Sequence, residues 1–210
     1  MQTLSKRLDL VASLVKKGST IADVGTDHGY IPIYLCKTGI IKGAVACDIN
    51  IGPLSSCEAL VLQEGLSDYI KVRLSNGLDN VKSQEFDTLI IAGMGGELIK
   101  DILSRCTYVK EKHIILNPMT HCEIVRKYLY DNGFEIINDI IVEDSKHYYS
   151  VLDAKYTGNI VPKNRTDYYL GEIKDFSCKG YFAHLLNYLK NKEKSGEDYS
   201  DVITALEEIL

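Results

Sequence analysis

The segment best suited to bind a ligand is DVGTDHGY, residues 23–30, which lies between a short apolar run and a helical pattern. Its glycines, Gly25 and Gly29, let the backbone approach a ligand closely, and the helix that follows offers unpaired N–H groups. Ligands of open α/β sheets bind at the carboxyl ends of the strands, where this segment is expected to lie. It is therefore the first candidate for a binding site.

Two acidic residues of this segment, Asp23 and Asp27, indicate which ligand it suits. Dinucleotide-binding loops have the pattern G-x-G-x-x-G, whereas Asp27 stands here where another glycine is expected. A carboxylate such as Asp23 repels a pyrophosphate, but it attracts a cationic amino acid group and binds hydroxyls. The segment therefore favours S-adenosylmethionine over a nicotinamide dinucleotide. The alternative is an ordinary tight turn in which Asp27 caps the next helix.

Residues after three further expected strands extend this candidate site. Asp48 ends the second strand, where an acid binds both ribose hydroxyls in nucleotide-binding folds. SNGL, residues 75–78, follows the third strand and can place a small polar side chain beside an adenine. GMGG, residues 93–96, follows the fourth and leaves space where a cofactor meets its substrate. Each of these features alone is as typical of an ordinary loop as of a ligand site. The interpretation as a cofactor site depends on their order after successive strands.

These loops supply the expected contacts of cofactor and substrate. The expected cofactor-binding residues are Asp23, Gly25, Thr26, Gly29, Asp48, Ile49, Asn76, Gly77 and Gly93. The segment NPMT, residues 117–120, is similar to the motif of amino-group adenine methyltransferases in its first two residues but follows the fifth strand instead of the fourth. We interpret it as a loop on the substrate side. The expected substrate-binding residues are Met94, Asn117 and Pro118.

Alternating apolar patterns predict the elements that position these loops. Strands are expected at 21–24, 43–48, 70–74, 87–92, 113–116, 134–142 and 148–154, and helices at 4–15, 29–38, 53–64, 97–104 and 121–132. Five β–α units followed by an antiparallel pair, with a charged turn at 143–146, predict an α/β, Rossmann-like doubly wound sheet of seven strands with a reversed edge strand. The polar stretch 157–167 is a predicted linker. Apolar residues at helical spacing around 182–189 and 199–210 then predict an α-helical hairpin.

Composition excludes several classes of protein. No apolar run approaches the roughly 18 residues of a membrane span, and the charged N-terminal stretch is unlike a secretory signal. The six cysteines form no CxxC pair and have no histidine at ligand spacing, so we expect reduced thiols and no metal. The net charge of −5 argues mildly against a polyanionic partner.

The motifs LSKRLDLVA, DVGTDHGY, DINIGPL, SNGL, IIAGMGG and the pair Asn117-Pro118 together resemble the bacterial tRNA (adenine-N1)-methyltransferases that act at tRNA position 22, a TrmK-like family of class I methyltransferases. The resemblance covers residues 1 to about 155 closely and the helical hairpin in architecture. It implies S-adenosyl-L-methionine as donor, tRNA as acceptor and a cytoplasmic location. We accordingly expect a catalytic domain at 1–157 and a hairpin at 158–210 that aids tRNA binding, in a chain more consistent with a monomer than with an oligomer.

The implied reaction requires the adenine to be flipped out of its stem, because N1 lies on the Watson–Crick edge. Asp27 is the candidate to accept a hydrogen bond from N6, with a cofactor contact as the alternative. His28 could contact the base or the cofactor, and Arg7 could hold a phosphate or close over the pocket. Three basic groups could contact the RNA backbone: Lys6, Arg7, Lys16 and Lys17; Lys163 and Arg165; and Lys190, Lys192 and Lys194.

Three other functions remain open on the sequence. A small-molecule methyltransferase of the same fold suits the acidic charge and predicts turnover without RNA. A non-catalytic module would bind S-adenosylmethionine but would have no activity. Asp27→Ala would then leave cofactor binding intact. A nicotinamide oxidoreductase is disfavoured by the loop pattern.

Overall fold

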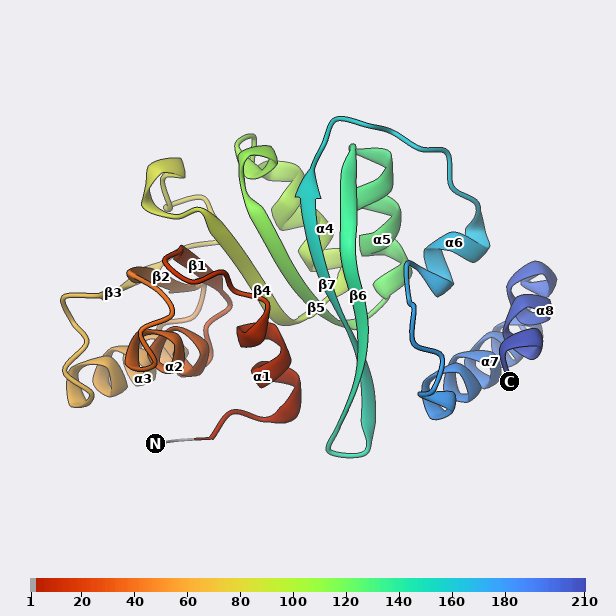
Figure 1. Ribbon diagram of the computed structural model, residues 1–210, viewed down its shortest axis with the longest axis horizontal. Coiled ribbons are helices and arrows are strands. Elements are labelled where there is room, and N and C mark those ends of the chain that lie inside the picture. Colours follow the sequence, from red (N-terminus) through yellow and green to blue (C-terminus); the bar gives the residue numbers. More distant parts are fainter. Residues whose placement is uncertain (1–2) are drawn as a thin grey trace.

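The computed structural model describes residues 3–210, in which seven strands form one sheet (Figure 1). The strands are β1 (Thr20–Val24), β2 (Gly43–Asp48), β3 (Ile70–Leu74), β4 (Thr88–Gly95), β5 (His113–Thr120), β6 (Phe134–Asp144) and β7 (His147–Tyr156). Their order is β3-β2-β1-β4-β5-β7-β6. The strands from β1 to β5 pair in parallel, and β7 is antiparallel to both β5 and β6. The predicted fold class is confirmed, and its reversed strand, β7, lies between β5 and β6.

Helices cover both faces of this sheet. They are α1 (Lys6–Ser13), α2 (Tyr30–Lys37), α3 (Ile51–Gln63), α4 (Gly96–Arg105), α5 (Cys122–Asp131), α6 (Arg165–Leu170), α7 (Lys179–Glu193) and α8 (Ser200–Ile209), with short 3-10 helices η1 (Ser83–Glu85) and η2 (Val109–Glu111). Helices α1, α2 and α3 lie on one face, and α4 and α5 lie on the other (Figure 1). No helix within residues 3–210 is both long and apolar enough to span a membrane.

The core consists of one apolar cluster on each face of the sheet. In β4, Leu89 and Ile91 pack into the cluster beneath α4 and α5, whereas Ile90 packs into the cluster beneath α1, α2 and α3. Successive side chains of a strand point to opposite faces, so a strand covered on both sides must be apolar at every position. This explains why the continuous run TLIIA is found in the centre of the sheet.

Several boundaries differ from the sequence expectations: the helix expected at 4–15 is shorter, and strand pairing extends β4, β5, β6 and β7 further than local patterns show. β4 and β5 continue to Gly95 and Thr120, with irregular register around Met94, so GMGG and NPMT lie partly within the sheet. The predicted turn at 143–146 is shorter: Asp144 pairs with His147, and positive φ angles occur at residues 145 and 146. A two-residue turn with positive φ at both residues matches the twist of the long strands β6 and β7.

The C-terminal part contains the predicted hairpin, formed by α7 and α8, which share a third apolar cluster with Tyr169 and Ile173. The predicted linker at 157–167, however, extends three residues too far, because α6 already begins at Arg165. Asn164 caps α6 by accepting from the Asp167 N–H at 2.9 Å, and Asp167 accepts in return at 2.8 Å. A helix of six residues is too short to produce a readable apolar period.

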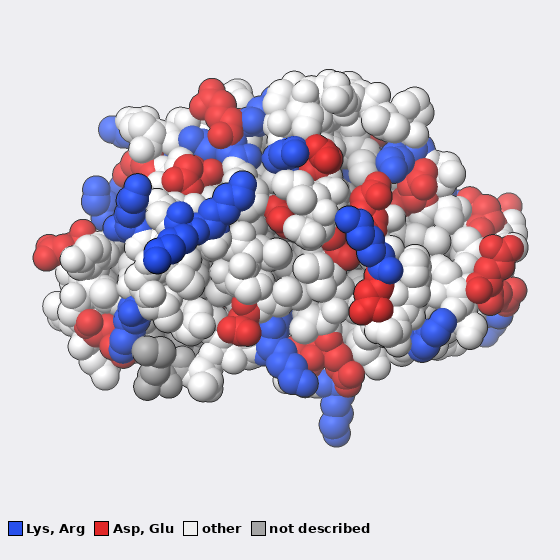
Figure 2. Space-filling view, in the orientation of Figure 1, with Lys and Arg blue, Asp and Glu red and all other residues white. Residues whose placement is uncertain are grey.

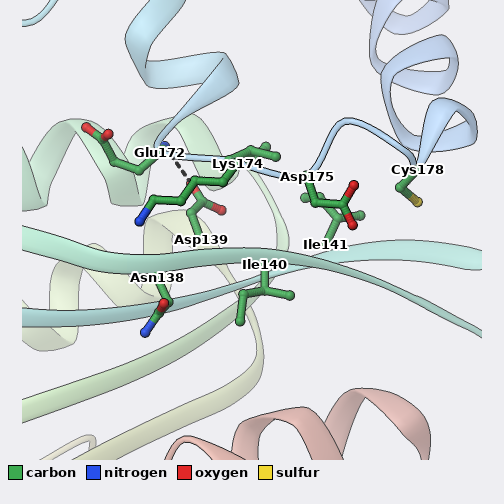
Figure 3. Close-up of a pocket in the computed structure, with 9 residues that line it drawn as sticks. Asn138, Asp139, Ile140, Ile141, Glu172, Lys174, Asp175 and Cys178 are labelled. Atoms are coloured by element: carbon green, nitrogen blue, oxygen red, sulfur yellow. Dashed lines mark hydrogen bonds between the residues drawn. The ribbon is translucent and has the colours of Figure 1, made fainter.

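A buried ion pair joins this C-terminal part to the sheet. Arg126 of α5 donates to both carboxylate oxygens of Asp139 on β6, at 2.8 and 3.0 Å, and both side chains are almost fully buried. Arg126 also donates to the carbonyl of Tyr169 at the end of α6, at 2.8 Å. The Glu172 N–H donates to Asp139 at 3.2 Å (Figure 3). A cavity of about 130 Å³ lies beside this joint, between β6 and the segment that follows α6 (Figure 3).

Candidate active site

The candidate site lies where the strand order reverses. β1 is followed by β2 on one side, whereas β4 lies on its other side and leads to β5. The connections after these strands leave the sheet in opposite directions, which opens a crevice at their carboxyl ends. The loop at 25–29 and the β4–α4 junction at 93–96 therefore lie at this edge of the sheet, as the sequence predicts.

Two carboxylates lie on the side of the crevice that the sequence predicts to bind the cofactor. Asp23, near the end of β1, is 5% exposed, and burial raises its pKa to about 6, with the nearby charge of Asp48 acting in the same direction. Asp48 ends β2, and its Oδ1 accepts the Asn50 N–H at 2.7 Å, which fixes the carboxylate. The two acids lie on neighbouring strands, as expected for binding one cationic, hydroxyl-bearing ligand.

The glycines of the 23–30 loop are required by close packing. Gly25 has φ +78°, and a Cβ there would lie 2.2 Å from Cε of Met94. Gly29 has φ +71°, and a Cβ there would lie 2.6 Å from Sγ of Cys57 in α3. Both positions combine a left-handed backbone with a close neighbour, so glycine satisfies two constraints at once. The loop is thereby packed closely between β4 and α3.

These groups fit the predicted cofactor. The buried Thr26 hydroxyl lies beside Asp23 and acts to lower the pKa of that carboxyl, against the larger effect of burial. At the far end, Ile49 is 61% exposed beside Asp48, and Asn76 is exposed with its Oδ1 accepting from Arg105 at 3.3 Å. Gly77 packs against Ile102 and shapes the loop next to Asn76. An acidic, hydroxyl-binding end and an apolar end are what S-adenosylmethionine requires.

Arg7 reaches the other side of the crevice from α1. Its guanidinium donates to Oδ1 of Asn117 at 2.6 Å and lies over the Tyr149 ring, 5.4 Å from the centroid. The Arg7 N–H donates to Asp144 at 3.3 Å, which attaches α1 to the β6–β7 hairpin. A Cβ at Gly93 would lie 4.0 Å from this guanidinium. Arg7 therefore lies at the end of β4, where the sequence expects the substrate.

Asn117 and Pro118, expected to bind substrate, are both buried. Asn117 accepts from Arg7 and donates to the Ser150 carbonyl at 2.9 Å, so it holds Arg7 in place. The predicted Met94 is half-buried against Gly25. Sequence reasoning did not identify Tyr149, because its place beside Arg7 depends on pairing between strands distant in the chain.

Asp27 and His28 lie at the rim. Their side chains are 81% and 41% exposed, with His28 Nε2 3.5 Å from Asp27 Oδ1. The His28 ring stacks on Tyr30 with centroids 5.1 Å apart. The helix cap proposed as the alternative for Asp27 is not found, because Gly29 precedes α2 without a side-chain cap. The Asp27 carboxylate thus remains accessible to a substrate.

Several basic residues expected to contact RNA are engaged in ion pairs. Lys163 pairs with Glu172 at 2.9 Å, Lys190 pairs with Glu207 at 2.6 Å, and Arg165 pairs with Asp201. On the face shown in Figure 2, Lys and Arg side chains are interspersed with Asp and Glu. No group of three His, Cys, Asp or Glu side chains in the described part of the chain is arranged to hold a metal ion.

Comparison with known proteins places this geometry in a family. Residues 4–152 match the family model of a methyltransferase domain. The tRNA (adenine(22)-N(1))-methyltransferase of Bacillus subtilis (strain 168) is 37% identical over 164 residues, covering 74% of this chain and 69% of that protein. The chain belongs to the tRNA (adenine-N1)-methyltransferase family. The resemblance of its motifs to this family is thereby confirmed.

Solved structures of the tRNA (adenine-N1)-methyltransferase family extend the match to the whole chain. A Streptococcus pneumoniae protein, provisionally assigned as a tRNA (m1A22) methyltransferase and solved with S-adenosyl-L-methionine, superposes with a TM-score of 0.90 at 32% identity, covering 99% of this chain and 100% of that one. TrmK of M. capricolum, solved with S-adenosyl-homocysteine, gives a TM-score of 0.81 at 27% identity, covering 99% and 94%. The C-terminal helices therefore belong to the shared architecture.

Proposed function

We propose that this chain methylates N1 of an adenine in tRNA, at position 22 by kinship, with S-adenosylmethionine as the methyl donor. The observation that carries the proposal is the pair of carboxylates Asp23 and Asp48, which end neighbouring strands beside the glycine loop at the switch point of the sheet. The kinship with the tRNA (adenine(22)-N(1))-methyltransferase of B. subtilis supports the same activity.

The cofactor side is assigned from the chemistry of its residues. Asp48 binds the ribose hydroxyls, and Asp23 balances the positive charge of the ligand. Backbone groups of Gly25, Thr26 and Gly29 contact the methionine part, while Ile49, Asn76 and Gly77 surround the adenine, and Gly93 leaves room at the junction with the substrate. When bound, S-adenosylmethionine would supply a methyl group on a positively charged sulfur: the adenine N1 lone pair would form the new C–N bond as the C–S bond breaks, with its electron pair left on a neutral thioether sulfur.

The acceptor side is assigned to the residues around Arg7. A base paired in a stem must be flipped out for its N1 to be reached, at a cost of a few kcal/mol of stacking and pairing. Arg7, held by Asn117 and Tyr149, is placed to contact the base or its phosphate. Met94 and Pro118 form the walls of the acceptor site next to Arg7.

Asp27 is proposed to orient the flipped adenine. Its exposed carboxylate can accept a hydrogen bond from the N6 amino group, which turns N1 towards the methyl group. This contact also stabilises the positive charge that develops on adenine during transfer. His28, beside Asp27, is proposed to contact the base.

Residues 158–210 are proposed as a separate helical domain that aids tRNA binding, after a catalytic domain at 1–157. The separate apolar cluster of α7 and α8 and the end of the methyltransferase match at residue 152 support this division. We propose a cytoplasmic location, because a tRNA substrate is found there and all six cysteines are free thiols.

Methyl transfer to tRNA tests the proposal directly. Purified protein is incubated with labelled S-adenosylmethionine and total tRNA from a strain that lacks the corresponding gene, and the digested tRNA is analysed for methylated nucleosides. We expect 1-methyladenosine from the unaltered protein, a loss of about a hundredfold or more in Asp27→Ala, and no loss in the control Asp68→Ala.

Asp68 is an appropriate control because it is exposed and precedes β3, at the opposite end of the strands from the site. Absence of transfer to tRNA despite cofactor binding would contradict the proposal and favour a small-molecule acceptor or a binding module. Unchanged activity in Asp27→Ala, with 1-methyladenosine still formed, would remove Asp27 from the reaction and leave the activity in place.

A further inference from the structure

A second hollow lies beside the candidate active site, between the β5–α5 connection, the start of β7 and α7. It has a volume of about 280 Å³. Its lining is rich in aromatic rings, and we call it the tyrosine groove: Tyr148, Tyr149, Tyr181, Tyr188, His121 and His184. None of these six residues is among those expected from the sequence to bind cofactor or substrate.

The groove is continuous with the acceptor side of the candidate site. Pro118, in its wall, directly follows Asn117, which holds Arg7. Tyr149 borders both places, because it belongs to the groove lining and its ring lies beneath the Arg7 guanidinium. A chain that enters the acceptor site over β5 can therefore continue into the groove.

Packing between α7 and β7 builds the groove. A Cβ at Gly180, in the first turn of α7, would lie 2.0 Å from Oη of Tyr148, so the absence of a side chain there allows the helix to approach the strand. Further along α7, Phe182 and Leu189 enter the C-terminal core, whereas Tyr188 is 37% exposed at the groove. The helical hairpin thus presents an aromatic side to the catalytic part.

The chemistry of the lining suits a nucleobase. Aromatic rings stack on bases whatever their identity, and sequence-specific RNA-binding proteins commonly take unstacked bases in this way. Glu123, at 3.1 Å from His121 Nδ1, supplies an acceptor for base amino groups. Lys192 lies one turn after Tyr188 on α7, with its Nζ 5.3 Å from the centroid of the Tyr188 ring and 5.8 Å from that of Tyr199. It has no carboxylate partner among residues 3–210 and can meet a phosphate there.

Charge gives a further reason for stacking. The chain carries a net charge of −5, and Lys163, Arg165 and Lys190 are held in ion pairs. Attraction of phosphates is therefore weak for an RNA-binding protein. Stacking supplies about 1–3 kcal/mol per base without requiring charge, so an aromatic groove compensates for the missing cations.

We propose that the tyrosine groove receives a second unstacked nucleobase of the RNA substrate, next to the adenine that is methylated. The inference rests on the proposed tRNA methylation and adds a second contact point on the substrate. It assigns to α7 the task of holding the RNA strand beside the reacting base, with Lys192 at the adjoining phosphate.

Fluorescence provides a direct test because the chain contains no tryptophan. Tyr188→Trp places a single indole in the groove, and Tyr69→Trp places one at an exposed site before β3, at the other end of the strands. Unmodified tRNA is titrated into each variant in the presence of S-adenosylhomocysteine. We expect saturable quenching of the indole at position 188 and no saturable quenching at position 69.

Kinetics of methylation provide a second test. We expect Tyr188→Ala to raise KM for tRNA by about 5- to 150-fold, the equivalent of one lost stacking contact. The Kd for S-adenosylmethionine is expected to stay unchanged, which also shows that the variant is folded. Tyr188→Phe keeps the ring and is expected to retain the KM of the unaltered protein.

The outcomes separate this inference from the proposed function. Suppose the unaltered protein forms 1-methyladenosine, but the indole at position 188 is not quenched or the KM of Tyr188→Ala is unchanged. Either result would contradict base binding in the tyrosine groove and leave the proposed methylation in place. Failure of the unaltered protein to methylate tRNA would overturn both.

Discussion

At the scale of single residues, Asp23 is a buried carboxyl that we propose lies beside the cationic cofactor. Its carboxyl is 5% exposed, and burial raises its pKa from 3.8 to about 6. The folded chain without ligand therefore holds the Asp23 proton more tightly than the unfolded chain does. Ionised Asp23 destabilises the empty protein above pH 6, and a bound cation relieves this penalty.

We predict that binding of S-adenosylmethionine weakens as pH falls through 6, because protonated Asp23 no longer attracts the cation. The Kd, measured by calorimetry, is expected to rise about tenfold between pH 7.5 and pH 5. Asp23→Asn should bind weakly at both pH values, with a Kd that hardly changes. An unaltered chain with the same Kd at both pH values would contradict this assignment.

The same residue predicts a change in stability. Asp23→Asn removes the buried charge, so the free energy of unfolding without ligand is expected to rise by about 3 kcal/mol at pH 7.5. The gain should shrink as pH falls through 6 and vanish below about 4, where both carboxyls are protonated. Urea unfolding at several pH values measures this, and a variant less stable than the parent at pH 7.5 would contradict it.

At the scale of elements, the end of α6 depends on Gly171. Its φ and ψ are 65° and −150°, a region that is accessible essentially to glycine alone. A Cβ there would lie 2.0 Å from Oδ2 of Asp139 and 2.4 Å from Nε of Arg126. The helix thus ends where its backbone meets the buried ion pair, and no side chain can be placed between them.

We predict that Gly171→Ala lowers the free energy of unfolding by about 3–5 kcal/mol, because it both strains the backbone and separates the ion pair. Gly39→Ala is the matched control: Gly39 has φ +66°, but no atom lies within 4 Å of the added Cβ. Its cost should be about 1 kcal/mol, which is the backbone contribution alone. Similar losses in the two variants, measured by urea unfolding, would contradict the close contact.

At the scale of the whole molecule, the Arg126–Asp139 pair couples the sheet to the C-terminal helices. Arg126 contacts the end of α6, Asp139 and the Ser150 hydroxyl, the last at 3.1 Å. Ser150 in turn carries the carbonyl that holds Asn117. The pair therefore lies between the hairpin and the residues that place Arg7.

We predict that Asp139→Asn lowers the free energy of unfolding by about 3–5 kcal/mol, because it leaves the Arg126 charge buried without its partner. Hydrogen exchange should increase first in α6, α7 and α8, and tRNA methylation should fall more than cofactor binding. Asp131→Asn breaks the exposed Lys127–Asp131 pair of α5 and should cost less than about 1 kcal/mol. Uniform exchange throughout the chain would contradict the coupling.

Much of the fold follows from local sequence patterns. Runs such as IADV and TLIIA place the central strands, and their order places Asp23, Gly25 and Asp48 at the carboxyl edge, at or just after the ends of β1 and β2. These features are readable because strand and helix periods, and the need for glycine at positive φ, act within a few residues. The sequence by itself therefore determined the fold class and predicted that the residues proposed to bind the cofactor lie at one edge of the sheet.

The tertiary structure alone decided the acceptor half and its surroundings. The Arg7–Asn117 bond joins residues 110 apart, Tyr149 lies under Arg7 through the pairing of β7 with β6, and α7 completes the tyrosine groove. α6 was missed because its stability comes from capping and packing instead of an apolar period. Contacts between distant segments depend on how whole elements pack, and no local period in the chain encodes that arrangement.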